Sequence, residues 1–217
     1  MSNERDPGSL IVSTLEKAWR DIQARHPEVP NVIFITGTGM VKDGVKWGHF
    51  HAEQWITDSG RIHELFVSGE ALNREPVETM TTLLHEAAHG TCFEKGLKGT
   101  SRRGKYHNKV FVKESETLGL MWPEGQKPDT TRGFSAVVMR SETIEAYADT
   151  IEALKEGRAA WKELGLALAD EKKPKSTNTK PKAECVCPGR YIWTAAKTLE
   201  ENPVICGGCD TEFMMVG

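Results

Sequence analysis

The sequence lacks the features that mark membrane-embedded, secreted and disulfide-rich proteins. None of its apolar runs approaches the length of a membrane span, and its polar start, MSNERDPGS, has no leader character. Cysteine occurs five times in 217 residues, and four of the five lie after residue 184. The hydrophobic content of 38% is ordinary for a soluble chain that buries one good core. We therefore expect an intracellular, cytoplasmic protein that has no membrane partner.

The most informative motif is a pair of histidines four residues apart, with a glutamate after the first. It reads His85-Glu86-Ala-Ala-His89. Residues four apart lie on one face of a helix, so His85 and His89 can reach one metal ion while Glu86 lies beside it. Zinc at such a site polarises a scissile carbonyl and activates a zinc-bound water, for which Glu86 is the expected general base. The motif predicts a zinc-dependent hydrolase, and a metallopeptidase before any other class.

The surrounding sequence favours a helix for this motif. The residues on the face that is expected to pack inward recur at helical spacing: Val77, Met80, Leu84, Ala87 and Thr91. Pro76 suits the first helical position, and Gly96 lies just past the expected end. The two histidines are thus expected on an ordered, partly buried helix.

A catalytic zinc usually takes three protein ligands, so a third ligand must lie elsewhere in the chain. The metzincin continuation is excluded, because it needs a glycine and a histidine where this chain has Cys92 and Lys95. Two kinds of ligand remain open from the residues alone. A glutamate from a later helix would be Glu114 or Glu116, and a histidine would be His107.

The C-terminal cysteines form two close pairs. These are Cys185 with Cys187 and Cys206 with Cys209. Their spacing predicts a four-cysteine zinc ribbon, although the Cys-x-Cys half is tighter than usual. Disulfides are disfavoured, because an intracellular compartment keeps thiols reduced. The fifth cysteine, Cys92, is expected to be a buried free thiol.

These motifs together resemble the SprT-like metallopeptidases, the family that includes Spartan. The likeness rests on the HExxH motif, on residues 104–111 (GKYHNKVF), which resemble the family's third-ligand segment, and on the cysteine ribbon. It is best over residues 32–120 and 185–213. By resemblance, Glu86 is the catalytic base, and His107 joins His85 and His89 at the catalytic zinc. The resemblance also implies a small zincin domain with a few antiparallel strands, and action on proteins attached to DNA.

The rest of the chain predicts an α+β fold. Strand candidates lie at residues 31–36, 45–54 and 61–68, between an N-terminal helix and the motif helix. A long helix is expected over 142–169, followed by a flexible basic linker at 170–183. The predicted domains are a zincin-like domain at 8–169 and a ribbon at 184–217.

Two further histidines share one face of the second predicted strand. They are His49 and His51, which lie two residues apart. We expect a polar strand face lining the cleft or the solvent, in preference to metal ligands, because the helix pair already accounts for a metal.

The net charge of −3 gives no reason to expect nucleic acid, but the distribution of charge along the chain does. Residues 95–113 contain seven lysines and arginines and no acid. We expect part of this segment to hold phosphates at the rim of the cleft: Lys98, Arg102, Arg103, Lys105 and Lys109. A purely solvated loop would have the same composition. The acidic ribbon would contact nucleic acid through stacking of Tyr191 or Trp193.

The sequence therefore predicts a zinc metalloendopeptidase that cleaves proteins bound or crosslinked to DNA, which is a DNA-repair role. It would hold one catalytic and one structural Zn²⁺. Three alternatives stay open: a regulatory metallopeptidase that cuts a specific repressor without DNA contact, a non-catalytic DNA-binding adaptor, and a small-molecule hydrolase using the same metal chemistry.

Overall fold

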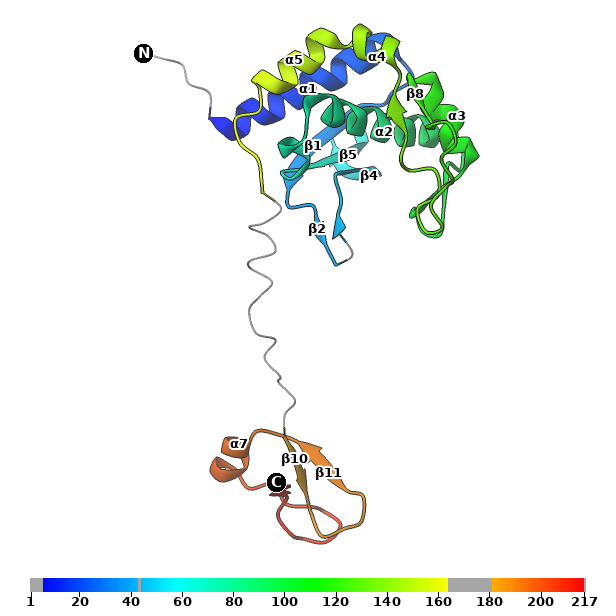
Figure 1. The fold of residues 1–217 in the computed structure, drawn as a ribbon. Helices are drawn as coiled ribbons and strands as arrows, with labels where there is room; N and C mark the ends of the chain where they lie inside the picture. Colours follow the sequence, from blue (N-terminus) through cyan, green and yellow to red (C-terminus); the bar gives the residue numbers. More distant parts are fainter. Residues whose placement is uncertain (1–5, 43, 164–180, 217) are drawn as a thin grey trace. The chain divides into compact units, whose positions relative to one another are not determined.

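A computed structural model describes residues 6–42, 44–163 and 181–216 of the chain (Figure 1). The chain divides into two compact units, residues 1–170 and residues 171–217. The architecture is mixed α+β, with small sheets in both units. Among the described residues, no helix combines the length and the apolar character needed to span a membrane.

The main sheet of the first unit has three strands in the order β1-β5-β4. Their bounds are Val32–Gly37 for β1, Gly48–Thr57 for β4 and Gly60–Ser68 for β5. The central strand, β5, buries Leu65 and Val67 completely, because the helices cover that face of the sheet. A bulge interrupts β4 after His51, and Glu53 there takes a positive φ of 54°.

The expectation of an antiparallel sheet is wrong for one of its two strand pairs. β4 and β5 are antiparallel, but β1 and β5 are parallel. The short hairpin of β2 (Met40–Val41) and β3 (Gly44–Val45) follows β1, and β4 then runs opposite to β5. β5 therefore lies next to β1 and runs in the same direction as β1. The sheet is thus mixed, with one parallel and one antiparallel strand pair.

Two long helices pack against this sheet and contribute nine of the 21 buried residues of the main core (Figure 1). Helix α1 (Pro7–Arg25) begins at a proline and buries Leu15, Ala18, Trp19 and Ile22. Helix α2 (Pro76–Glu94) follows the short 3-10 helix η1 (Ala71–Asn73). Its N-terminus carries a reciprocal capping box between Glu75 and Glu78, and it packs against β4, α3 and α5.

The segment after α2 consists of short hairpins around one helix. Strands β6 (Thr100–Ser101) and β7 (Tyr106–His107) pair with each other, and α3 (Lys109–Thr117) follows. Asn108 caps α3, because its side chain accepts hydrogen bonds from the backbone N–H groups of Val110 and Phe111. Strands β8 (Leu120–Met121) and β9 (Val138–Met139) form the next pair.

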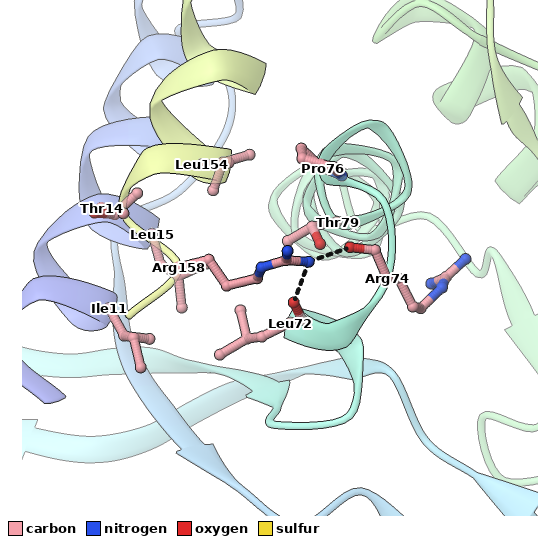
Figure 2. A pocket seen from close by; sticks show the side chains of 10 residues that line it. Ile11, Thr14, Leu15, Leu72, Arg74, Pro76, Thr79, Leu154 and Arg158 are labelled. Carbon is pink, nitrogen blue, oxygen red and sulfur yellow. Dashed lines mark hydrogen bonds between the residues drawn. The ribbon is translucent and has the colours of Figure 1, made fainter. Parts of the chain in front are cut away.

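The long helix expected over residues 142–169 is wrong in its extent. The structure has α4 (Ser141–Ala146) and α5 (Ala148–Glu156), which meet at Tyr147, and α5 ends at Gly157. Arg158 then donates to the backbone carbonyls of Leu72 and Arg74 at 3.4 and 3.3 Å (Figure 2). These hydrogen bonds attach the segment that follows α5 to η1 and the residue after it. Residues 164–169 lie outside the described residues.

The pocket in Figure 2 lies between α1, η1, α2 and the end of α5. Ile11, Leu15, Leu72 and Leu154 contribute apolar side chains to its lining. None of the residues in the HExxH motif lines it. The side chain of Arg158 lies in this pocket and makes its hydrogen bonds there, so we interpret the pocket as a packing feature and not as a substrate site.

The second unit is a small β structure. Strand β10 (Lys182–Glu184) pairs with β11 (Tyr191–Trp193) on one side and with β12 (Met214–Met215) on the other, and α7 (Ala196–Glu201) lies between β11 and β12 in the sequence. Its buried core contains Ala183, Cys206 and Phe213. Strand β10 therefore begins inside the range that was expected to be linker, and residues 170–180 lie outside the described residues.

Candidate metal centres and active site

Helix α2 places His85 and His89 on one face, as their spacing requires. Both imidazoles are partly exposed, whereas Glu86, Ala87 and Ala88 between them are buried. The inward face that was expected from the sequence is largely the buried one, because Met80, Leu84, Ala87 and Thr91 are all inaccessible to solvent. The helix thus holds the two imidazoles at the edge of the core.

His107 joins this pair from strand β7. Its Nε2 atom lies 3.2 Å from Nε2 of His85 and 3.0 Å from Nε2 of His89, and the latter two atoms are 3.2 Å apart. Both the backbone N–H and Nδ1 of His107 lie within hydrogen-bond distance of the carbonyl oxygen of Arg132, at 3.0 and 3.1 Å. When Nδ1 donates to this carbonyl oxygen, Nε2 is unprotonated and faces the other two histidines.

The donor set of this histidine triad fits a tetrahedral zinc ion. Zinc–nitrogen bonds of about 2.0–2.1 Å place tetrahedral ligand atoms about 3.3 Å apart. The three Nε2 separations agree with that value within a few tenths of an ångström. With all three Nε2 atoms unprotonated, they could not satisfy one another by hydrogen bonding, whereas one cation could satisfy all three. The triad could therefore hold a metal ion.

Burial keeps the triad in the form that binds metals. It lowers the pKa of His85 well below the ordinary value, that of His89 to about 3 and that of His107 to a smaller extent. Phe111 of α3 supplies much of this apolar environment, because its ring centroid lies 4.5–4.7 Å from those of all three imidazoles and its side chain is fully buried. The imidazoles are consequently neutral at physiological pH.

Glu86 lies between α2 and strand β4. Burial raises the pKa of this carboxyl to about 8, although a hydrogen bond from the backbone of Phe50 and the charge of Lys46 both act to lower it. Gly48 makes the close approach possible: a Cβ at that position would meet Oε1 of Glu86 at 3.3 Å and the side chain of Thr82 at 2.9 Å. Gly48 was not foreseen from the sequence, because only the packing of β4 on α2 reveals it.

The two glutamates that were left open as a third ligand lie elsewhere. Glu114 is buried and accepts a hydrogen bond from Lys95 at 2.6 Å, and Glu116 lines a separate pocket with Arg25 and Arg140. Neither belongs to a group of potential ligand atoms with the HExxH histidines. The geometry brings His107 to these histidines instead.

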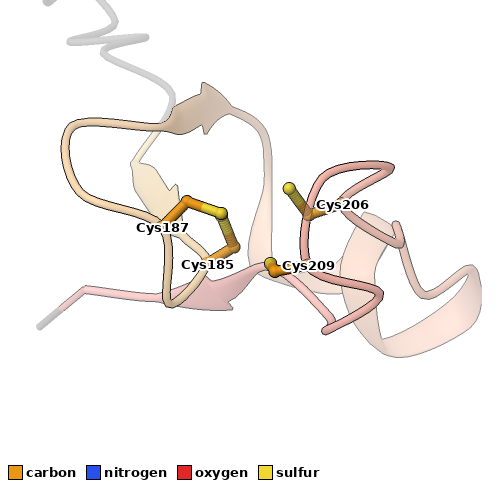
Figure 3. A group of neighbouring side chains, drawn as sticks. All are labelled: Cys185, Cys187, Cys206 and Cys209. Carbon is orange, nitrogen blue, oxygen red and sulfur yellow. The ribbon is translucent and has the colours of Figure 1, made fainter.

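The four C-terminal cysteines gather in the second unit (Figure 3). The Sγ atoms of Cys185, Cys187, Cys206 and Cys209 all lie within 4.8 Å of one another, so this cluster could hold a metal ion. A hydrogen bond from the backbone of Gly208 and another from Arg190 lower the pKa of Cys206 to about 6. A thiolate is the form that binds metal, so these polar groups favour ligation at Cys206, whereas a hydrogen bond with Cys209 raises the pKa of Cys187 to about 12 and burial raises the pKa of Cys185.

Cys92 does not belong to either cluster. Its side chain is buried beside Gly99, and burial raises the pKa of the thiol to about 11. A buried, protonated thiol is unreactive, which matches the expectation of a free structural cysteine.

The predicted phosphate-contacting residues lie on the loop between α2 and His107 and at the start of α3. All five, Lys98, Arg102, Arg103, Lys105 and Lys109, are exposed. Arg102 also has a structural contact, because it donates to the carbonyl of Thr130 at 2.7 Å and stacks on Tyr106 at 4.7 Å. Arg103 and Lys105 make no ion pair with any described residue. The loop thus presents positive charge on the segment that leads into His107.

Comparisons with protein-family models, with curated proteins and with solved structures found no match to this chain. The functional argument therefore rests on the residues and on their geometry.

Proposed function

We propose that this protein is a zinc-dependent metalloendopeptidase of the SprT-like kind, acting on proteins bound or crosslinked to DNA. The observation that carries the proposal is the convergence of three imidazole Nε2 atoms within 3.2 Å, next to the buried carboxyl of Glu86. Three nitrogen ligands with an adjacent carboxylate form the usual composition of a catalytic, and not a structural, zinc site.

The partial exposure of the triad supports a catalytic role. His85 and His89 both retain contact with solvent, so a substrate or a water molecule can approach from the side opposite the core. When bound there, zinc would supply a Lewis acid that polarises the scissile carbonyl and activates water. The four-cysteine cluster, by contrast, uses all of its positions for protein ligands, which suits a structural zinc.

Glu86 is suited to move a proton in this reaction. Its buried carboxyl is held by the backbone of Phe50 and bordered by Gly48, so its position is fixed before a substrate arrives. A dication bound beside it would favour the ionised carboxylate. We propose that a carboxylate oxygen of Glu86 accepts the proton of the attacking water and returns it to the leaving amine.

Strand β4 supports a polypeptide as the substrate in preference to a small molecule. Among the described strands, β4 pairs with β5 alone, and the backbone N–H of Phe50 points away from β5 towards Glu86. A peptide that added itself as a strand along this edge would pass beside Glu86 and the histidine triad.

Two surfaces support a DNA-linked role. The first is the basic loop of residues 95–113, which leads directly into His107. The second is on the ribbon, where Tyr191 and Trp193 are exposed and stack edge to face at 5.7 Å, with Lys182 over the ring of Tyr191 at 4.5 Å. Positive charge on the loop and exposed aromatic rings on the ribbon, where Lys182 is itself paired with Glu184, both suit binding of single-stranded nucleic acid.

The deciding experiment is cleavage of a DNA-binding protein by the purified, zinc-loaded full chain, with no DNA, with single-stranded DNA and with duplex DNA. The matched control is Glu86→Gln, which removes the proton acceptor but no ligand, so it should keep zinc and fold while losing turnover. Full activity of Glu86→Gln would overturn the catalytic assignment.

The three DNA conditions distinguish the alternatives. Cleavage that needs both DNA and Glu86 supports the proposal. Cleavage that needs Glu86 but is indifferent to DNA favours a regulatory peptidase. DNA binding without any cleavage favours a non-catalytic adaptor, and turnover of small esters or amides with proteins left intact favours a small-molecule hydrolase.

A further inference from the structure

A second histidine cluster lies on the main sheet, away from the HExxH histidines. It consists of His49 and His51 on β4 and Glu64 on β5, and we refer to it as the strand cluster. His51 and Glu64 are directly paired across the two strands, and His49 lies two residues along on the same face. The sequence argument considered the two histidines alone, and the strand pairing adds the carboxylate.

The distances in the strand cluster are those of a potential ligand set. Oε1 of Glu64 is 3.3 Å from Nε2 of His49 and 3.9 Å from Nδ1 of His51, and one ligand atom from each residue lies within 4.8 Å of the others. The two imidazole rings are close, with centroids 4.1 Å apart. Two imidazoles and one carboxylate form a donor set that binds zinc and other divalent transition metals.

Neighbouring side chains hold these groups in place. Trp55 donates its indole N–H to Oε2 of Glu64 at 3.0 Å, which leaves Oε1 directed at the histidines. The ring of His49 stacks on Phe66, with centroids 4.9 Å apart. A hydrogen bond to a ligating carboxylate and a packed ligand ring are both typical of the surroundings of metal sites.

The hydrogen bonding of His49 is incomplete within the described part of the chain. Its Nδ1 atom is buried and has no partner there, although its Nε2 atom contacts Glu64. Nε2 is therefore the His49 atom that faces Glu64 and would hold an ion, and Nδ1 would then carry the proton of the neutral imidazole. The side chain of His51 is 52% exposed, so an ion can enter the cluster from solvent.

We propose that His49, His51 and Glu64 form a further binding site for a divalent transition-metal ion, with zinc as its first candidate. The ion would bridge β4 and β5 at the residues just before the bulge. Because Gly48, the neighbour of His49, borders Glu86, occupancy of this site would also hold the strand that flanks the histidine triad. The proposal does not depend on peptidase activity.

The test is calorimetric titration of Zn²⁺ into the full chain after it has been brought to two zinc ions per chain. We expect one further equivalent to bind. Glu64→Gln keeps an acceptor for Trp55 but removes the charged ligand, and His51→Ala removes an exposed ligand, so both should weaken this equivalent by at least about tenfold. The matched control is Glu53→Gln, which alters an exposed carboxylate of the same strand outside the cluster.

Amide hydrogen exchange provides a second readout. Filling the site should slow exchange of residues 48–57 in the wild type and in Glu53→Gln, but not in Glu64→Gln or His51→Ala. The proposal is overturned if the wild type takes up no further zinc, or if both ligand variants bind it as tightly as the wild type.

Discussion

The position of His107 depends on a close backbone contact with Gly133. Gly133 takes a φ of +64°, and a Cβ at this position would lie 2.1 Å from the carbonyl oxygen of His107. That oxygen accepts a hydrogen bond from the backbone N–H of Phe134 at 3.0 Å. Only glycine therefore lets the loop after β8 close against β7, and this contact orients the third member of the histidine triad.

We predict that Gly133→Ala lowers both stability and zinc content. The alanine would incur the cost of left-handed backbone, about 1–2 kcal/mol, and would also collide with the carbonyl of His107. Gly125→Ala is the matched control, because Gly125 has a φ of +73° but no atom within 4 Å of an added Cβ. Thermal unfolding should therefore show a larger loss for Gly133→Ala, and metal content should fall by the triad zinc only. Equal effects of the two substitutions would contradict this account of His107.

The residues of the site differ in how far the sequence could predict them. His85, Glu86 and His89 follow from helical spacing, which is a local property. His107 was singled out only by resemblance, since 12 residues of loop and hairpin separate it from α2 and nothing local fixes where that loop returns. Gly48 and Glu64 act through contacts between separate elements, so a reading of local patterns could not identify them.

At the scale of elements, the main errors concern direction and extent. Three strands were expected and are present, but parallel pairing of β1 with β5 depends on contacts far apart in sequence. The apolar periodicity after residue 142 favoured one long helix. The chain instead turns at Tyr147 and leaves the helix at Gly157, where a Cβ would meet the side chain of Thr14 on α1 at 2.1 Å. Tertiary packing thus overrides the local pattern.

The basic loop between α2 and α3 carries a prediction about DNA. We expect the double variant Arg103→Glu with Lys105→Glu to weaken DNA binding and to reduce the slope of log K against log salt by about two, because each lost phosphate contact removes about one released counterion. Arg102 is left unchanged because it also holds the loop to Thr130 and Tyr106. Fluorescence anisotropy with short single-stranded and duplex oligonucleotides at several salt concentrations measures both quantities.

A charge-matched control separates this local effect from net charge. Arg20→Glu with Lys155→Glu makes the same change in net charge on α1 and α5, where the side chains form only exposed ion pairs. This control should keep the salt slope of the wild type. If the loop variant also keeps it, the basic loop is a solvated surface, and the DNA contact must be sought on the ribbon.

At the scale of the whole molecule, the two units differ in what stabilises them. The first unit has an extensive core that includes Leu15, Leu65, Leu83 and Phe111, all of which are buried. Within residues 181–216, the second unit has three buried core residues, Ala183, Cys206 and Phe213, with partly buried side chains packed around them. A core of that size cannot by itself offset the conformational entropy of ordering its strands, so we propose that a metal ion held by the four cysteines supplies much of the folding free energy.

This difference predicts that loss of the ribbon metal unfolds one unit and spares the other. Cys206→Ser with Cys209→Ser should remove one zinc per chain and collapse the amide NMR signals of residues 181–216, while signals of the first unit stay in place. Cys92→Ser is the matched control, because Cys92 belongs to neither cluster, and it should keep the zinc content of the wild type. Shifts throughout the first unit of the double variant would show that the ribbon contributes to its stability. If the first unit is unchanged, any loss of DNA-stimulated cleavage in the double variant can be assigned to the ribbon's contact with DNA and not to damage at the histidine triad.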